Sequence, residues 1–318
     1  MGEMIGKQSV KFAEAPYIFE GASVVGPKEG EGPLGKLFDV IEQDPMLGSK
    51  SWEEAESLLQ KETVQKLLLK SGLKKEDIRY IFAGDLLGQL IATTFGIMDY
   101  EIPFMGLYGA CSTMGEGLSL AAMMVAAGYG ENVIAMASSH FGSAERQFRF
   151  PLEYGNQRPF SATWTVTGCG AAIVTKRKGF ARITGVTTGK IIDYGVKDAQ
   201  NMGACMAPAA ADVIYNHLND FGTAPDDYDK IITGDLGYVG QAILIDLLKR
   251  KGIDISKVHM DCGIEMFDKE NQDTHSGGSG CGCSATVLTS YVFKQLKKKA
   301  WKKRWSRAVK CWHGCTAA

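Results

Sequence analysis

Cys111 is the residue of this sequence whose type and setting point most directly to chemistry. It lies in the segment Gly109-Ala-Cys-Ser-Thr-Met-Gly-Glu-Gly117, at the start of a run of small residues that predicts a helix over 115–127. The start of a helix presents free N–H groups and a partial positive charge, which lower the pKa of a thiol and favour a nucleophilic thiolate. The same N–H groups suit a bound carboxylate. A small buried cysteine with no chemical role is the third interpretation of this pattern.

A second candidate, His275, opens the glycine-rich segment Thr274-His-Ser-Gly-Gly-Ser-Gly-Cys-Gly-Cys-Ser284. Glycines allow the backbone to approach a ligand closely. A histidine in such a turn can act as a base, or it can donate a hydrogen bond to a carboxylate. The alternative is a loop histidine that caps the helix after it.

Asp85, Asp235 and Ser138 each close a predicted strand. Sites in α/β proteins form at the carboxyl ends of strands, so these side chains are further candidates. Either aspartate could instead cap the helix that follows it. Ser138 is followed by Ser139 and His140, and its hydroxyl could line the same region.

These candidate residues lie at the ends of predicted strands and helices that alternate along the chain. The predicted helices are Glu53–Ser71, stopped by Gly72, and 115–127; the predicted strands are Ile78–Ala83, Asn132–Ser138 and Gly170–Thr175. Apolar residues at helical spacing indicate the first helix. Strands that are apolar throughout are typical of a sheet covered on both faces. The alternation therefore predicts an α/β fold with largely internal sheets.

The first half of the chain is echoed in the second. The segment Leu73–Leu86 resembles Thr223–Leu236, and both end in Gly-Asp-Leu. Ile18–Val25 is loosely echoed by Ala181–Thr188, and the segments that begin at Cys111 and at His275 each open a small-residue helix. Three matches in the same order predict two duplicated halves.

The composition is that of an ordinary globular protein. The chain has 318 residues, of which 45% are hydrophobic and 22% are charged, so it can bury a substantial core. Its 35 basic residues nearly balance its 36 acidic ones, so the overall charge gives no indication of nucleic-acid binding. The charge is uneven, however, because residues 297–318 hold eight basic residues and no acidic one.

No segment predicts a membrane span or a secretory signal. The longest apolar run, Leu118–Gly128, is shorter than the roughly 20 residues that a transmembrane helix needs. The first residues carry an acidic charge and no apolar stretch follows them, so export by the general pathway is not expected. The eight cysteines lie in apolar or glycine-rich settings, so we expect reduced thiols.

Two duplicated halves, with Ala-Cys-Ser opening a buried helix in the first and His-x-Gly-x-Ser-Gly opening one in the second, resemble the thiolase/3-ketoacyl synthase superfamily. The resemblance implies a thiolase-like duplicated five-layer α/β/α/β/α fold, normally found as a homodimer. The halves would be residues 1–177 and 178–296, followed by an atypical basic tail, 297–318. The chemistry of that superfamily is acyl transfer through a cysteine thioester, with carbanion condensation.

Longer motifs narrow the resemblance to the stage V sporulation protein AD family, over about residues 5–296. They include Tyr108-Gly-Ala-Cys-Ser-Thr113, the run from Ser138 to Arg149 and the run from Asp198 to Pro208. The resemblance implies a protein that binds dipicolinic acid (pyridine-2,6-dicarboxylate), free or with calcium. Its partners would be membrane proteins of the same sporulation operon, in a complex for dipicolinate uptake and release. It would be a cytoplasmic-type soluble protein, peripheral at the inner spore membrane.

Carried over onto matching positions, the resemblance places the ligand at Asp85, Cys111, Ser138 and His275, with no metal and no cofactor. The start of the helix after Cys111 could bind one carboxylate, and His275 with the N–H groups of its turn could bind the other. Asp85 would repel a dianion unless it is protonated, orients a donor or meets calcium.

The resemblance implies no catalytic residue, yet the residue types leave an alternative. That alternative is a ketoacyl synthase III-like acyltransferase with Cys111 as nucleophile and His275 beside it. A third hypothesis is a scaffold that docks partner proteins and binds no small ligand.

The sequence departs from these patterns in two places. Nothing matches the second catalytic cysteine that thiolases carry near the C-terminus, since Cys281 and Cys283 lie on the wrong side of His275 for that role. Condensing activity is therefore not expected. The tail 297–318 shows no strand alternation, whereas the family ends in an apolar strand at this point. A basic tail with tryptophan could touch anionic lipid, or it could be extra sequence without a fold.

Overall fold

The computed structural model describes residues 2–148, 158–301 and 308–313 of the chain. Its largest sheet contains ten strands within these ranges. Along the main path the strands lie in the order β1 (Glu3–Ile5), β2 (Ser9–Lys11), β10 (Ala181–Thr188), β3 (Tyr17–Val25), β9 (Gly168–Thr175), β7 (Asn132–Ser139), β5 (Tyr80–Gly84) and β6 (Phe104–Gly106). Off this path, β4 (Val40–Ile41) pairs with β3, and β14 (Ala308–His313) pairs with β10.

The centre of this sheet mixes strand directions. β5 runs parallel to both β6 and β7, whereas β9 runs antiparallel to both β3 and β7. Two smaller sheets pair β11 (Ile231–Thr233) with β12 (His259–Asp261), and β8 (Trp164–Thr165) with β13 (Gly278–Ser279), both in parallel. β7 and β9 are buried at every position, as the fully apolar strand patterns predict.

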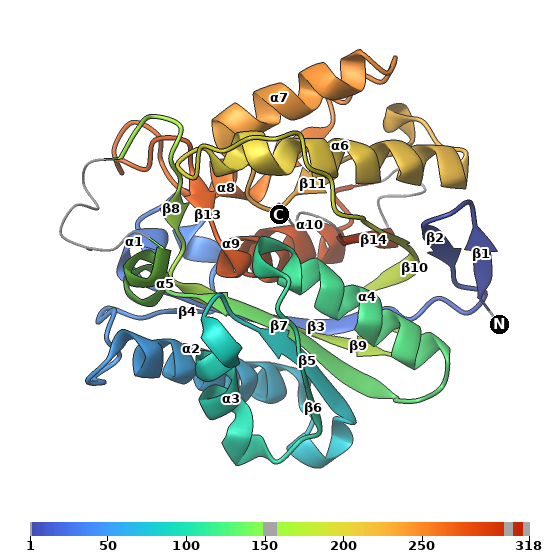
Figure 1. The fold of residues 1–318 in the computed structure, drawn as a ribbon. Coiled ribbons are helices and arrows are strands. Elements are labelled where there is room, and N and C mark those ends of the chain that lie inside the picture. Colours follow the sequence, from blue (N-terminus) through green and yellow to red (C-terminus); the bar gives the residue numbers. More distant parts are fainter. Residues whose placement is uncertain (1, 149–157, 302–307, 314–318) are drawn as a thin grey trace.

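The helices cover the sheets in layers (Figure 1). α2 (Trp52–Ser71) and α3 (Ile91–Ile97) lie on one face of the large sheet, and α4 (Thr113–Ala126) and α9 (Cys281–Val287) lie on the other. Beyond α4 and α9 come β11 and β12, and then α6 (Met202–Phe221) and α7 (Gly237–Lys249). The order is α/β/α/β/α, which confirms the predicted fold class.

Short helical elements complete the chain. They are α1 (Pro27–Gly30), α5 (Phe141–Phe148), α8 (Cys262–Met266), α10 (Phe293–Lys297), η1 (Gly35–Leu37), η2 (Lys75–Asp77), η3 (Gly88–Leu90), η4 (Met98–Tyr100), η5 (Ala110–Ser112), η7 (Pro225–Asp227) and the π-helix η8 (Leu288–Val292).

Local sequence signals set the ends of α2. The hydroxyl of Ser51 accepts a hydrogen bond from the backbone N–H of Glu54 at 3.2 Å, so Ser51 caps the helix start. Gly72 ends the helix with φ of +68°, a left-handed conformation that glycine adopts without steric cost. The predicted helix Glu53–Ser71 with its glycine stop is thereby confirmed.

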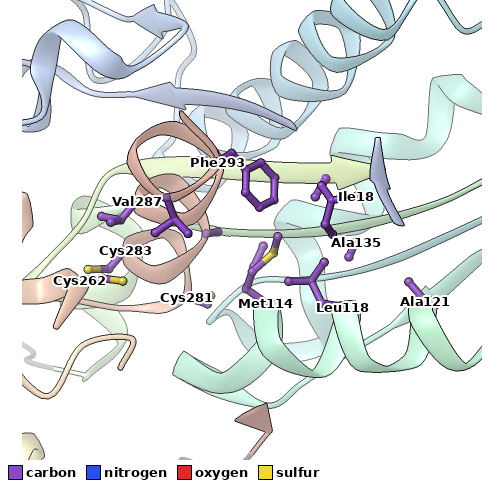
Figure 2. Packing of buried hydrophobic residues seen from close by; sticks show 14 of the residues in the cluster. Ile18, Met114, Leu118, Ala121, Ala135, Cys262, Cys281, Cys283, Val287 and Phe293 are labelled. Carbon is purple, nitrogen blue, oxygen red and sulfur yellow. The ribbon is translucent and has the colours of Figure 1, made fainter. Parts of the chain in front are cut away.

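Three apolar cores lie between the layers. One lies between α2 and the large sheet and includes Leu59, Leu67 and Ile134. A second lies between the other face of that sheet and the α4–α9 layer, where Met114 and Leu118 of α4 pack near Cys281 of α9 (Figure 2). The third lies among α6, α7 and β11. Because each core joins two neighbouring layers, the loops at the strand ends are held between rigid elements.

The predicted second half of the chain, residues 178–296, has a small sheet. Within the described residues its own sheet holds only β11 and β12. The strand that opens this half, β10, pairs instead with β2 and β3 of the large sheet. The predicted boundary at residues 177 and 178 lies in the turn between β9 and β10, and it stays a prediction.

The tail differs from the sequence expectation. Residues 308–313 form β14 and pair in parallel with β10, although the sequence of 297–318 lacks the alternating pattern that predicts a strand. The physical reason is that β2 and β3 pair with β10 along one edge, so an extended segment can pair with the backbone N–H and C=O groups of its other edge whatever its side chains.

Candidate functional site

Cys111 lies in η5, directly before α4, where the sequence places it. The residue before it, Ala110, has φ of +48°, a left-handed conformation that costs free energy in a residue with a Cβ. This strained turn leads directly into α4 and leaves Cys111 half-buried. Strain of this kind is retained where the surrounding structure requires a side chain in one position.

The Cys111 thiol donates a hydrogen bond to the carboxylate of Asp235, which follows β11. The backbone N–H of Gly280, just before α9, donates to Oδ2 of the same carboxylate at 2.9 Å. Burial raises the pKa of the Cys111 thiol well above its ordinary value, and the negative charge of Asp235 raises it further. The thiol is therefore held in its neutral form.

Asp235 is itself buried, and burial raises its pKa to about 6. The hydrogen bonds from Cys111 and Gly280 favour the carboxylate and lower this pKa, whereas the nearby charge of Asp261 raises it. Asp261 ends β12 and accepts hydrogen bonds from the hydroxyl of Thr233 at 2.6 Å and from the N–H groups of Leu236 and Gly237 at 2.9 and 3.0 Å. Asp261 thus fixes the turn that carries Asp235.

Asp85 lies in the turn after β5 and is fully buried. Its Oδ1 accepts a hydrogen bond from the N–H of Leu87 at 2.7 Å, and its Oδ2 accepts from both the N–H and the hydroxyl of Thr93, at 2.7 and 2.5 Å. Burial raises the pKa of this carboxyl. Asp85 therefore joins β5 to α3, as one of the sequence interpretations, local capping, anticipates.

Ser138 lies at the end of β7 with its side chain in a buried polar network. Its hydroxyl donates to Oε1 of Glu56 at 2.7 Å and accepts from Nε2 of Gln60, also at 2.7 Å. The same amide nitrogen of Gln60 lies 2.9 Å from the hydroxyl of Thr93, which bonds to Asp85. Burial and the charge of Asp85 raise the pKa of Glu56 to about 8. Ser138 and Asp85 thus belong to one network.

Cys281 lies between this network and the Cys111–Asp235 pair. Its thiol donates to the backbone carbonyl of Ser138 at 2.7 Å. Burial raises its pKa, and the charges of Asp85 and Asp235 both add to the rise. Its position near Met114 of α4 is visible in Figure 2, where Cys262 and Cys283 lie beyond it. The structure therefore brings Asp85, Cys111 and Ser138 into one neighbourhood.

His275 is oriented by a different set of contacts. It has φ of +51°, its Nδ1 lies 2.8 Å from the carbonyl oxygen of Pro159, and its Nε2 lies 3.1 Å from Oδ1 of Asp273. Its ring also lies 5.4 Å from that of Phe160. Within the described residues, no hydrogen bond joins His275 to Cys111. The next residue, Ser276, accepts hydrogen bonds from the first turn of α7, so the histidine turn packs against the helix that follows Asp235.

Sequence reasoning gave Asp85, Asp235 and Cys111 as candidates, but it did not pair Asp235 with Cys111. It also assigned no role to Gly280 or Cys281. The internal echo contained the signal for Asp235, because it placed this residue in the position equivalent to Asp85. Nothing in the local sequence marks Gly280 as the N–H donor, since that contact joins segments far apart in the chain.

The arrangement offers hydrogen-bond donors and neutral thiols rather than an activated nucleophile. A thiol that donates to a carboxylate is not the thiolate that acyl transfer requires. No group of three metal-ligating side chains is placed to hold an ion among the residues that the structure describes. Six cysteines are free thiols, namely Cys111, Cys169, Cys205, Cys262, Cys281 and Cys283.

A family model described as stage V sporulation protein AD (SpoVAD) matches residues 6–308 of the chain. The chain belongs to the stage V sporulation protein AD family. A relative with that description from Bacillus subtilis (strain 168) is 43% identical over 296 residues, which cover 93% of this chain and 87% of the relative. The family resemblance stated from the motifs is therefore confirmed.

Two solved structures have a fold similar to that of this family member. The 3-oxoacyl-[acyl-carrier-protein] synthase III from Aquifex aeolicus VF5 aligns with a TM-score of 0.55 and 13% identity, over 89% of this chain and 91% of that one. The priming β-ketosynthase from the R1128 polyketide biosynthetic pathway gives the same TM-score and identity, over 93% and 91% of the two chains. At this identity the similarity shows a thiolase-like fold.

Among the helices that the structure describes, none combines the length and the apolar character of a transmembrane span.

Proposed function

We propose that this chain binds dipicolinic acid, free or with calcium, on a thiolase-like scaffold that has lost acyl-transfer activity. The observation that carries the proposal is the hydrogen bond from the Cys111 thiol to the carboxylate of Asp235. A ketosynthase of the type III class needs a cysteine thiolate, and a neighbouring carboxylate opposes its formation. Membership of the stage V sporulation protein AD family supports a role in the dipicolinate complex of the spore-forming cell.

The ligand would lie at the former acyl-transfer position, beside Cys111. The first turn of α4 presents N–H groups and the positive end of a 14-residue helix, which suit one carboxylate of the ligand. The turn that holds His275 packs against the first turn of α7 and would supply donors for the second carboxylate. Asp85 and Ser138 would support the site from the buried side, since their side chains are bound into the network with Glu56 and Gln60.

The proposal is tested by calorimetric titration of the purified chain with dipicolinic acid, with and without calcium. Saturable binding that is weakened at least tenfold in both Cys111→Ala and His275→Ala is expected. Asp246→Asn is the control, because Asp246 is an exposed residue of α7 paired with Arg250 at 2.8 Å, and its change should leave the affinity unchanged. No binding by folded wild-type protein would contradict the proposal.

The acyltransferase alternative is tested on the same samples. Incubation with acetyl-CoA or a longer acyl-CoA, followed by mass spectrometry, should show no acyl group on Cys111. A stable acyl adduct at this residue that Cys111→Ala abolishes would favour the alternative. If the chain neither binds dipicolinic acid nor becomes acylated, the hypothesis of a protein-docking scaffold is favoured instead.

We further propose that the chain forms a homodimer through the edge of the large sheet. Within the described residues β6 ends the strand order and pairs only with β5, so it presents one open edge. Exposed apolar side chains surround this edge, namely Ile91, Phe95 and Met98 of the α3 region, Met105 of β6, and Tyr108. An apolar, unpaired edge is unfavourable in water, and a second copy of the chain would cover it.

The setting of this function would be the inner spore membrane. There the protein would be peripheral and would act with membrane proteins of the same sporulation operon in moving dipicolinate. Co-purification of the tagged chain with those membrane proteins from sporulating cells, compared with the Phe95→Glu variant as a dimer-deficient control, tests this assignment.

A further inference from the structure

The carboxylate of Asp235 occupies donors that an anionic ligand beside Cys111 would need. It accepts the Cys111 thiol hydrogen bond and, at 2.9 Å, the N–H of Gly280. An ionised Asp235 therefore competes with a ligand carboxylate for the same donors and repels its charge. A protonated Asp235 would instead donate a hydrogen bond to that ligand. The protonation state of the Asp235 side chain thus decides whether this position repels or binds an anion.

Among the described residues, the groups that shift the pKa of Asp235 include no cation that would offset the repulsion. The titratable groups that face it come from four elements, and they are Cys111 of η5, Asp261 of β12, Cys262 of α8, and Cys281 and Cys283 of α9. Within the described residues, no lysine or arginine forms an ion pair with Asp235. Each of these neighbours is acidic or neutral, so none of them offsets the repulsion between a bound carboxylate and Asp235.

We propose that Asp235 takes up one proton from solvent when a carboxylate ligand binds beside Cys111, so that binding is linked to protons. The inference rests on the proposed function and names a further ligand-binding residue, Asp235, in the same site. No covalent bond is made or broken. One proton moves from solvent to a carboxylate oxygen of Asp235, and the resulting acid donates a hydrogen bond to the ligand.

The pH dependence of ligand affinity follows from the direction in which the pKa of Asp235 is shifted. In the free protein the pKa of Asp235 is raised to about 6. A bound anion destabilises the ionised form and raises this pKa further. Between the free and bound values the affinity falls as pH rises, by at most about tenfold for each pH unit, and it levels off on both sides of that window. Dipicolinate should therefore bind more tightly at pH 6 than at pH 8.

The experiment is calorimetric titration of wild-type protein with dipicolinic acid at pH 6, 7 and 8, in two buffers that differ in ionisation enthalpy. The difference between the buffers gives the number of protons taken up. We expect uptake near pH 7 that approaches one proton per ligand. Asp235→Asn should bind with an affinity that changes less than twofold over this range and without uptake, because the amide donates at every pH. Asp246→Asn is the control, since Asp246 is an exposed residue of α7 paired with Arg250 at 2.8 Å.

The outcomes separate this inference from the proposed function. Wild-type binding without proton uptake would overturn this inference and leave the proposed function standing. This result does not depend on the folding of any variant. Uptake that persists in a folded Asp235→Asn protein and disappears in Glu56→Gln would also overturn it, because the proton would then go to the Glu56 network. No dipicolinate binding at any pH by folded wild-type protein would overturn the proposed function itself.

Discussion

The thiol of Cys111 donates a hydrogen bond to the carboxylate of Asp235, and the two residues come from opposite halves of the chain. Cys111 precedes the buried helix α4, whereas Asp235 follows β11. The pairing joins two turns that lie far apart along the chain. It converts a cysteine at a helix start, which the sequence marks as a possible nucleophile, into a neutral donor.

This pairing predicts that Cys111 reacts slowly with alkylating reagents. At pH 8, iodoacetamide should modify Cys111 more slowly than Cys205, as measured by peptide mass spectrometry over time. Asp235→Asn should accelerate the modification of Cys111 several-fold, because removal of the carboxylate lowers the thiol pKa. The control Asp246→Asn should leave the rate unchanged. Rapid labelling of Cys111 in the wild type would count against a neutral thiol.

The buried Glu56 network predicts a loss of stability as pH rises. The pKa of Glu56 is raised from 4.5 to about 8, so the folded state holds a proton that the unfolded state releases above pH 4.5. The free energy of unfolding should therefore fall between about pH 4.5 and 8 and level off above that window. Glu29, whose pKa burial raises to about 7, contributes in the same direction.

Thermal unfolding at pH 5.5 and pH 8 checks this contribution. Glu56→Gln should lose less stability between the two pH values than the wild type, because the amide cannot ionise. Glu54→Gln, an exposed position on the same helix, should follow the wild type. An unchanged difference between the pH values in Glu56→Gln would show that this carboxyl is not the source.

Gly280 is predicted to be intolerant of a side chain. Its φ of +98° and ψ of +162° lie in a region open essentially to glycine, and a Cβ would come within 2.8 Å of Oγ of Ser139. Gly280→Ala should lower the free energy of unfolding by about 2–4 kcal/mol and weaken dipicolinate binding.

Gly252 provides the matched control. It has φ of +78°, and a Cβ there would meet nothing within 4 Å. Gly252→Ala should cost only about 1–2 kcal/mol, from the left-handed backbone alone, and leave binding intact. Chemical denaturation measures both variants. Equal losses in the two would contradict the close packing of Gly280 against β7.

The open edge at β6 predicts the assembly state. Phe95 is 59% exposed on α3, and Phe95→Glu should convert a dimer into a monomer in analytical ultracentrifugation, because burying a carboxylate in an apolar interface is unfavourable. Leu69→Glu is the control, since Leu69 is also strongly exposed but lies on α2. A monomeric wild type, or a dimer unaffected by Phe95→Glu, would show that the edge is not the interface.

The sequence predicted the elements best where local rules set them. The helix Glu53–Ser71 is found as Trp52–Ser71, with its glycine stop, because capping and apolar spacing are properties of consecutive residues. The buried strands Asn132–Ser138 and Gly170–Thr175 lie within β7 and β9 for the same reason. The tail was harder to predict, since β14 pairs through backbone groups that side-chain alternation does not report.

In the candidate site, too, the sequence predicts positions along the chain better than contacts between distant residues. The positions of Cys111 before a helix and of Asp85, Asp235 and Ser138 after strands follow from local pattern and from the duplicated halves. The hydrogen-bond partner of each side chain does not follow from the sequence pattern. Asp85 bonds to Thr93 and Ser138 to Glu56, whereas His275 lies against Pro159 and Asp273. Their roles in ligand binding stay predictions.

By itself, the sequence determined the family, the α/β class and the small set of residues from which a site could be built. These depend on residue types and on their spacing along the chain. Only the tertiary structure decided that Cys111 meets Asp235 and the N–H of Gly280, and that Cys281 lies between this pair and the Ser138 network. The reason is physical, since burial and hydrogen bonding between distant segments set the charge of a thiol and a carboxyl, and neither is encoded locally.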